Sequence, residues 1–189
     1  MKKSTSIAVV IAAIVLLGLL FGVGMYNGLV KKEVAVSTAW AQVENVLQRR
    51  ADLIPNLVSS VKGYVTHERE VLDDLAMART QYTGAATVSD KIKAAGEMEG
   101  ALGRLLVIVE NYPNLKANET FLKLMDELAG TENRIAVERK RYNEAVQDFN
   151  TTIRKIPYNI MAGMAGFTPK PFFEAQPAAH NVPKVDFGK

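Results

Sequence analysis

The sequence has 189 residues, no cysteine, two histidines, and 23 basic against 20 acidic side chains, for a net charge of +3. The lack of cysteine excludes disulfides, thiolate catalysis and sulfur-ligated metals. Basic and acidic residues are interspersed without a basic stripe, so we expect no nucleic-acid partner. Phosphate-loop, metalloprotease and serine-hydrolase motifs are also missing, so we expect neither a cofactor nor a metal.

The N-terminal region predicts a membrane anchor. Lys2 and Lys3 precede an unbroken apolar run, residues 7–26, which as a helix would cross a hydrocarbon core of about 30 Å. We expect a short N-terminal segment at residues 1–6 and a transmembrane anchor at residues 7–30. A cleaved signal peptide is the alternative, but the run is longer than a usual signal core and has no small-x-small cleavage site. Lys31 and Lys32 follow the run, so positive charge flanks both ends and leaves the orientation undecided.

A coiled-coil spacing of four and three residues runs from residue 36 to residue 82 and predicts one long helix. Pro55 lies inside this pattern, where it would clash with the carbonyl of Ala51 and remove one backbone hydrogen bond. Because the spacing keeps its phase across Pro55, we expect a kinked helix. The alternative is a break, with Asp52 capping a second helix.

Two further helices are predicted after a loop at residues 84–89. The first covers residues 90–110 and ends near Tyr112 and Pro113, and a connection at residues 114–118 leads into the second. The second has the clearest pattern of the chain, over residues 121–156, before Pro157 stops it. Its seam consists of Phe121, Met125, Leu128, Glu132, Ile135, Arg139, Tyr142, Val146, Phe149, Ile153 and Ile156.

Charged residues in these patterns form a candidate interhelical cluster. Glu132 and Arg139 occupy seam positions of the helix at 121–156. Arg49, Arg50 and Asp52 lie within one turn next to Pro55. An unpaired charge inside a bundle would cost several kcal/mol, so we hypothesise that some of these side chains pair between helices, Arg50 with Glu132 in particular, and fix their register. The alternative is a solvated cluster beside the proline.

The segment after Pro157, residues 158–174, is apolar and interrupted by glycine and proline. It is interpreted either as a cap that closes one end of the bundle, which we favour, or as a surface that contacts lipid or a second copy of the protein. Residues 175–189 are expected to form a flexible tail. The candidate interaction surface consists of Trp40, Ile160, Met164, Phe167, Phe172 and Phe173.

Short runs of specific residues recur along the chain at residues 40–45, 49–58, 61–64, 112–113, 115–118, 131–135, 142–143, 149–150, 162–164 and 166–167. With these runs the chain resembles the LemA family of bacterial membrane proteins over about residues 26–175. The resemblance implies one N-terminal anchor in a bacterial inner or plasma membrane, followed by an up-and-down helical bundle. It implies no catalytic residues. For the side of the membrane, our expectation leans towards the periplasmic or extracytoplasmic one.

The expected fold is therefore all-α. A transmembrane helix precedes a bundle at residues 31–174 with three long helices and one short one, or four if Pro55 breaks the first. Three functions are considered: a non-enzymatic membrane scaffold that forms homo-oligomers, an adaptor that docks another membrane protein such as a protease or sensor, and an enzyme using carboxylates such as Glu44 and Glu132. No nucleophile, metal set or oxyanion site accompanies those carboxylates, so the scaffold is favoured and the adaptor is the alternative.

Overall fold

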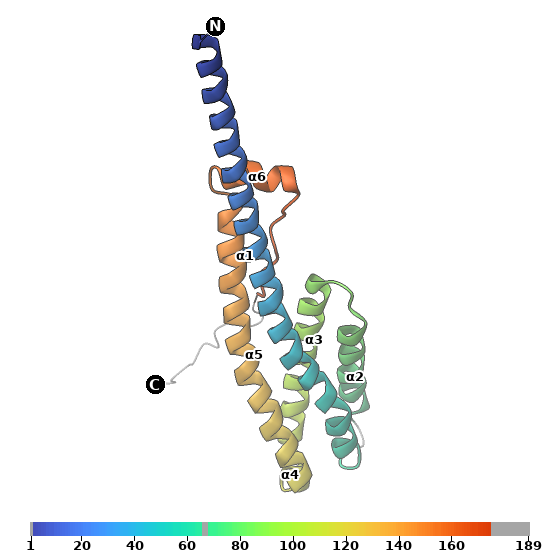
Figure 1. Ribbon diagram of the computed structural model, residues 1–189. Helices are drawn as coiled ribbons and strands as arrows, with labels where there is room; N and C mark the ends of the chain where they lie inside the picture. Colours follow the sequence, from blue (N-terminus) through green and yellow to red (C-terminus); the bar gives the residue numbers. More distant parts are fainter. Residues whose placement is uncertain (1, 66–67, 175–189) are drawn as a thin grey trace, which may run out of the picture. The chain divides into compact units, whose positions relative to one another are not determined.

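The computed structural model describes residues 2–65 and 68–174, and within these ranges all regular structure is helical (Figure 1). This confirms the all-α fold class. The predicted tail at residues 175–189 lies outside the described residues. The helices are α1 (Lys2–Lys62), α2 (Arg69–Gly84), α3 (Val88–Val109), α4 (Pro113–Lys116), α5 (Glu119–Thr152) and α6 (Tyr158–Ala165).

Helix α1 continues through Pro55 without a break. The proline ring lies on the exposed side of the helix, while Ile54 and Leu57 on either side of it are buried. The bulky ring therefore lies on the solvent side, which is the convex side when a helix curves around a core. The predicted continuity at Pro55 is confirmed, and the alternative of a break there is wrong.

The prediction of a single helix up to residue 82 is wrong, because α1 ends at Lys62 and α2 begins at Arg69. Gly63 and Tyr64 form a turn, in which the Tyr64 amide donates to the Val61 carbonyl at 2.9 Å. Glycine is a poor helix former, so the chain can leave the helix at this point at little cost. The seam residues Leu75, Ala78 and Tyr82 are buried nevertheless, because α2 is an amphipathic helix of its own.

The starts of α3 and α5 follow from capping residues. The Thr87 hydroxyl accepts a hydrogen bond from the Asp90 amide at 3.1 Å, and the Asn118 side-chain oxygen accepts one from the Phe121 amide at 3.0 Å. Both satisfy amides that have no partner within the first turn of a helix. At its other end α5 stops at Thr152, before the predicted residue 156, and Ile156 is exposed instead of lying in the seam.

The chain divides into two compact units, to which α1 and α5 both contribute. The bundle unit comprises the described parts of residues 42–140 together with residues 171–174, and its α2 packs against α3. The anchor unit comprises residues 2–41 and 141–170. Buried apolar side chains of the bundle unit include Leu47, Ile54, Leu57, Leu75, Met98 and Leu105, and those of the anchor unit include Leu29, Val36, Trp40, Tyr142, Val146 and Phe149.

The first part of α1 is apolar and mostly exposed. Within the described residues α1 contains the one stretch that is long and apolar enough to cross a membrane. Its large apolar side chains between residues 7 and 23 are each 55–65% exposed. A soluble protein rarely leaves so long an apolar surface in water, so this finding fits the predicted anchor.

Candidate functional site

The candidate site is centred on Arg50, which is only 4% exposed in the interior of the bundle unit. Its Nε donates a hydrogen bond to the Thr131 hydroxyl of α5 at 3.2 Å, and its terminal nitrogen forms an ion pair with the Glu132 carboxylate. The Thr131 hydroxyl in turn donates to the Leu128 carbonyl at 2.7 Å. The guanidinium group is thus held by two neighbouring side chains of α5.

The two charges of this pair have different surroundings. The Arg50 side chain is 5% exposed, whereas the Glu132 side chain is 49% exposed. Water therefore screens the carboxylate and reduces its desolvation cost, while the guanidinium depends on protein partners. The planar guanidinium group bonds its partners in a fixed geometry, and the role of the pair in fixing the register of α1 and α5 in the bundle unit stays a prediction.

The other members of the predicted cluster are not part of this pair. Arg49 points away towards Glu127 at 3.7 Å, and both side chains are largely exposed. Asp52 accepts a hydrogen bond from Gln48 of the same helix at 2.9 Å. Arg139 lies 3.9 Å from Glu99 and 4.4 Å above the ring of Phe173. The structure therefore brings together Arg50 and Glu132, and places Arg49, Asp52 and Arg139 in separate contacts.

A second polar contact explains how the bundle unit accommodates Pro55. Proline has no N–H, so the Ala51 carbonyl one turn earlier loses its normal helical donor. The Arg79 Nε of α2 donates to this carbonyl at 3.0 Å. An arginine from a neighbouring helix thus replaces the missing backbone donor and ties α2 to α1. Sequence reasoning missed this contact, since it required knowing that the chain turns back before α2.

Glu44, one of the carboxylates considered for an enzyme, forms an ion pair with Lys91 of α3. Beside it, the Tyr82 hydroxyl lies 3.5 Å from the Glu44 carbonyl oxygen, to which it donates. Burial raises the pKa of Tyr82 well above its usual value, and the negative charges of Glu44 and Asp52 raise it further. Tyr82 therefore stays neutral at physiological pH. Within residues 2–65 and 68–174, no three histidine, aspartate or glutamate side chains gather as metal ligands.

Next to the Arg50 pair an apolar groove lies between α3 and α5. It comprises a cavity of about 300 Å³ that contains Arg50 and Glu132 in its wall, and an adjoining cavity of about 270 Å³ that shares Leu106 and Met125 with the first. We call these two cavities the α3–α5 groove. Its apolar wall consists of Leu102, Leu106, Val109, Phe121, Leu122, Met125, Leu128 and Ala129.

The predicted interaction surface is not a single surface. Trp40 and Phe173 are buried, Trp40 against the ring of Tyr142 at a centroid distance of 5.3 Å. Phe167 is half-buried within the anchor unit, and its ring lies 6.2 Å from that of Phe149. Only Ile160, Met164 and Phe172 of the predicted set are open to solvent. The expectation that Trp40 and Phe173 contribute an open surface is therefore corrected, because both fill the interior.

A family model described as the LemA family matches residues 39–187. The chain is 27% identical over 179 residues to magnetosome protein MamQ 2 of Paramagnetospirillum magneticum, a match that covers 81% of this chain and 66% of that protein. It is 26% identical to magnetosome protein MamQ of Magnetospirillum gryphiswaldense with the same coverage, 81% and 66%. It is 23% identical to protein LemA of Metamycoplasma hominis, over 74% of this chain and 64% of that protein. The chain thus spans slightly less than two thirds of the length of these relatives.

Proposed function

This chain belongs to the LemA family, and we propose that it is a non-enzymatic helical scaffold of a bacterial inner or plasma membrane that self-associates through the α3–α5 groove. The exposed apolar stretch of α1 supports the membrane location. The proposal places the bundle unit on the periplasmic or extracytoplasmic side. The carboxylates of Glu44 and Glu132 are engaged in ion pairs with Lys91 and Arg50, which supports a structural role for both side chains.

The observation that carries the proposal is the apolar groove itself. Leu106 and Leu122 line the groove and are 39% and 48% exposed, and Val107, which follows Leu106 on α3, is 71% exposed. Both helices therefore present apolar side chains beside their buried faces that this copy does not cover. A surface of this kind is typical of helix-in-groove association.

A second copy is a suitable occupant because two identical patches can face each other about a two-fold axis. The groove has charges of both signs in its lining, Glu110 and Lys116 in one cavity and Arg50, Glu99 and Glu132 in the other. Each copy therefore offers both cations and carboxylates to pair with a second copy. An anchor in the same membrane also raises the local concentration of the chain, so that a modest contact area suffices.

Site-directed cross-linking tests this function in the 189-residue chain, whose sequence has no cysteine. Val107→Cys in native membranes should give a cross-linked homodimer with a short bifunctional maleimide, and Leu106→Glu in the same chain should abolish it. Met77→Cys on α2 is a matched control, because Met77 is exposed but lies outside the groove. Cross-links from Val107→Cys to a different protein would favour the adaptor instead. A monomer in light scattering well above micromolar concentration, with no cross-link, would contradict both the dimer and the scaffold.

A further inference from the structure

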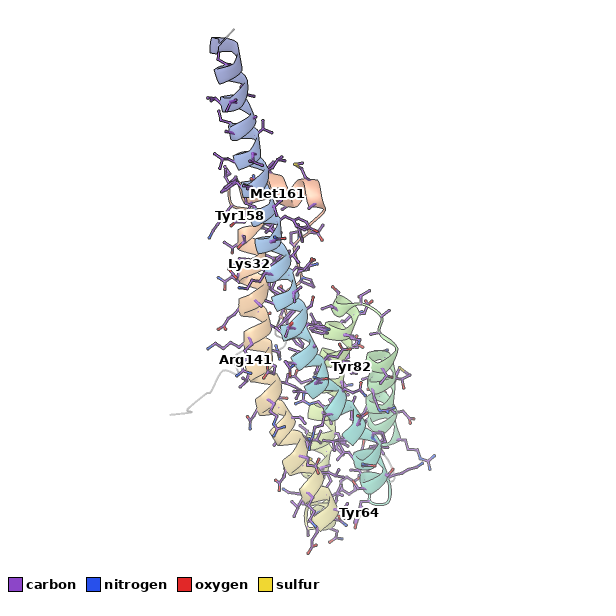
Figure 2. The ribbon with its side chains drawn as sticks, in the orientation of Figure 1. Lys32, Tyr64, Tyr82, Arg141, Tyr158 and Met161 are labelled. Carbon is purple, nitrogen blue, oxygen red and sulfur yellow. The ribbon has the colours of Figure 1, made fainter. Side chains whose placement is uncertain are left out.

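Helix α6 packs against the apolar stretch of α1 within the anchor unit (Figure 1). The Met161 methyl group lies 3.5 Å from the point where a Cβ atom on Gly22 would stand, and a Tyr158 ring carbon lies 3.9 Å from the equivalent point on Gly28. Figure 2 shows Met161 and Tyr158 beside α1 at these levels, with Lys32 further along the helix. Small residues on α1 thus let α6 approach the predicted anchor closely.

The side of α6 that does not face α1 is apolar and open. Ile160 and Met164 lie one helical turn apart on α6 and are 62% and 80% exposed, and Ile156, which precedes the helix, is 82% exposed. Residues 156–169 contain no charged side chain, whereas Arg154 and Lys155 before them and Lys170 after them are basic. This arrangement is typical of a segment that lies in a membrane interface, with cations at the level of the lipid phosphates.

The contact with Gly22 fixes the depth of α6 along α1. The apolar run ends at Tyr26, and Gly22 lies four residues earlier, which is about 6 Å along a helix. An amphipathic helix in the plane of a membrane typically buries its apolar face about 5–10 Å into the boundary between headgroups and acyl chains. The level set by Met161 and Gly22 falls within this range.

Ion pairs lie beyond Tyr26, on the side of Gly22 that leads away from the apolar run. Lys32 forms an ion pair with Asp148 at 2.5 Å, and Lys170 forms one with Glu33 at 2.5 Å. Asn150 also holds the backbone of Lys170 by two hydrogen bonds of 2.8 and 2.9 Å. The chain returns from α6 through Gly166, whose φ of +76° is a left-handed conformation that favours glycine. Residues 156–169 therefore form an uncharged, largely apolar segment with basic residues at both ends.

We propose that α6 lies in the membrane interface, in the leaflet from which α1 leaves the bilayer, with Ile156, Ile160 and Met164 in contact with lipid acyl chains. Lipid is the occupant that fits this face, because the face adjoins the exposed apolar side chains of α1 and lies at a depth where acyl chains begin. α6 would thus be a second point of membrane attachment, formed next to the anchor. This inference does not depend on self-association through the α3–α5 groove.

Spin labels at introduced cysteines test the proposal in the full-length protein reconstituted into phosphatidylcholine and phosphatidylglycerol vesicles. Met164→Cys and, independently, Ile160→Cys should give oxygen-to-nickel accessibility ratios above that of the water-exposed control Met77→Cys and below that of the anchor control Leu17→Cys. Asn159→Cys, on another side of the same helix, should give a lower ratio than Met164→Cys. Helical content measured by circular dichroism shows whether each variant is folded.

Two outcomes would overturn the proposal. Nickel accessibility at residues 160 and 164 equal to that at Met77→Cys would place this face in water. Protection from both oxygen and nickel, together with dipolar broadening between labels, would mean that a second copy covers the face instead of lipid. Neither outcome bears on the groove, whose cross-link is measured separately at Val107→Cys.

Discussion

The two units of this protein hold their helices together by different means. In the anchor unit aromatic rings pair in the interior, Trp40 with Tyr142 at 5.3 Å and Phe149 with Phe167 at 6.2 Å between centroids, while the ion pairs of Lys32 and Lys170 are partly exposed. In the bundle unit polar groups enter the interior, with Arg50 on Thr131 and Glu132 and Arg79 on a backbone carbonyl. Ring packing tolerates an apolar surrounding such as lipid, whereas buried polar groups fix geometry at the risk of a large cost when one partner is missing.

This difference predicts which substitutions each unit tolerates. The anchor unit should be sensitive to loss of volume, because its aromatic side chains fill space that no smaller residue can fill. The bundle unit should be sensitive to loss of a single partner and tolerant of removing both partners together. Four experiments test this contrast, in decreasing order of the change in stability that we expect.

Phe149→Ala should destabilise the anchor unit by about 3–5 kcal/mol, because it removes a fully buried ring and leaves a cavity. Hydrogen exchange of the detergent-solubilised chain, read by mass spectrometry, should show faster exchange within residues 141–152. Phe172→Ala, the same truncation at an exposed ring, is the matched control and should change little. Equal effects of the two variants would contradict a core role for Phe149.

Glu132→Ala should destabilise the bundle unit by about 2–3 kcal/mol, because the buried guanidinium of Arg50 loses its charged partner. Replacing both residues, Arg50→Met with Glu132→Leu, should recover most of this loss in denaturant unfolding. The exposed neighbour gives the control, since Arg49→Ala breaks a screened surface pair and should cost about 0–1 kcal/mol. A double-mutant coupling near zero for Arg50 and Glu132 would show that the pair does not stabilise the register.

Arg79→Met should destabilise the bundle unit by about 1–2 kcal/mol, since the Ala51 carbonyl loses its donor. In a Pro55→Ala background the same substitution should cost less, because the backbone amide restored at position 55 can then donate to the Ala51 carbonyl within the helix. Thermal unfolding of the four chains of this cycle measures the difference. The same cost in both backgrounds would mean that Arg79 acts through packing and not through the carbonyl that proline exposes.

The free energy of unfolding should fall above pH 10 because the Tyr82 hydroxyl ionises more easily in the unfolded state. Its pKa is raised in the folded state and near 10 when unfolded, so both states hold the proton below pH 10 and the contribution is fully present there. Above pH 10 the unfolded state loses the proton first and is stabilised, which costs the folded state about 1.4 kcal/mol by pH 11. Tyr82→Phe should make the fall in unfolding free energy between pH 9 and pH 11 shallower. An unchanged slope would show that other groups control it.

The family resemblance and the fold class were predictable from sequence, because α5 repeats its apolar spacing along its length and the anchor is long and uncharged. The end of α1 at Lys62 was not, since the spacing kept its phase by chance across the turn that begins at Gly63. The Arg50 and Glu132 contact was hypothesised from seam positions. Two contacts could not be predicted, the hydrogen bond from Arg79 to the Ala51 carbonyl and the packing of α6 against Gly22. Both form because the chain turns back on itself, and the spacing of apolar residues does not reveal such turns.

The absence of a break in α1 between the apolar stretch and Trp40 has a mechanical consequence. A transmembrane helix that is longer or shorter than the local bilayer thickness adapts by tilting. In many anchored proteins a flexible linker isolates the rest of the chain from such a tilt. Here the same unbroken helix α1 carries the apolar stretch, the contact with α6 and the contact of Trp40 with Tyr142 of α5. A tilt of α1 in response to bilayer thickness should therefore turn the whole anchor unit as one body.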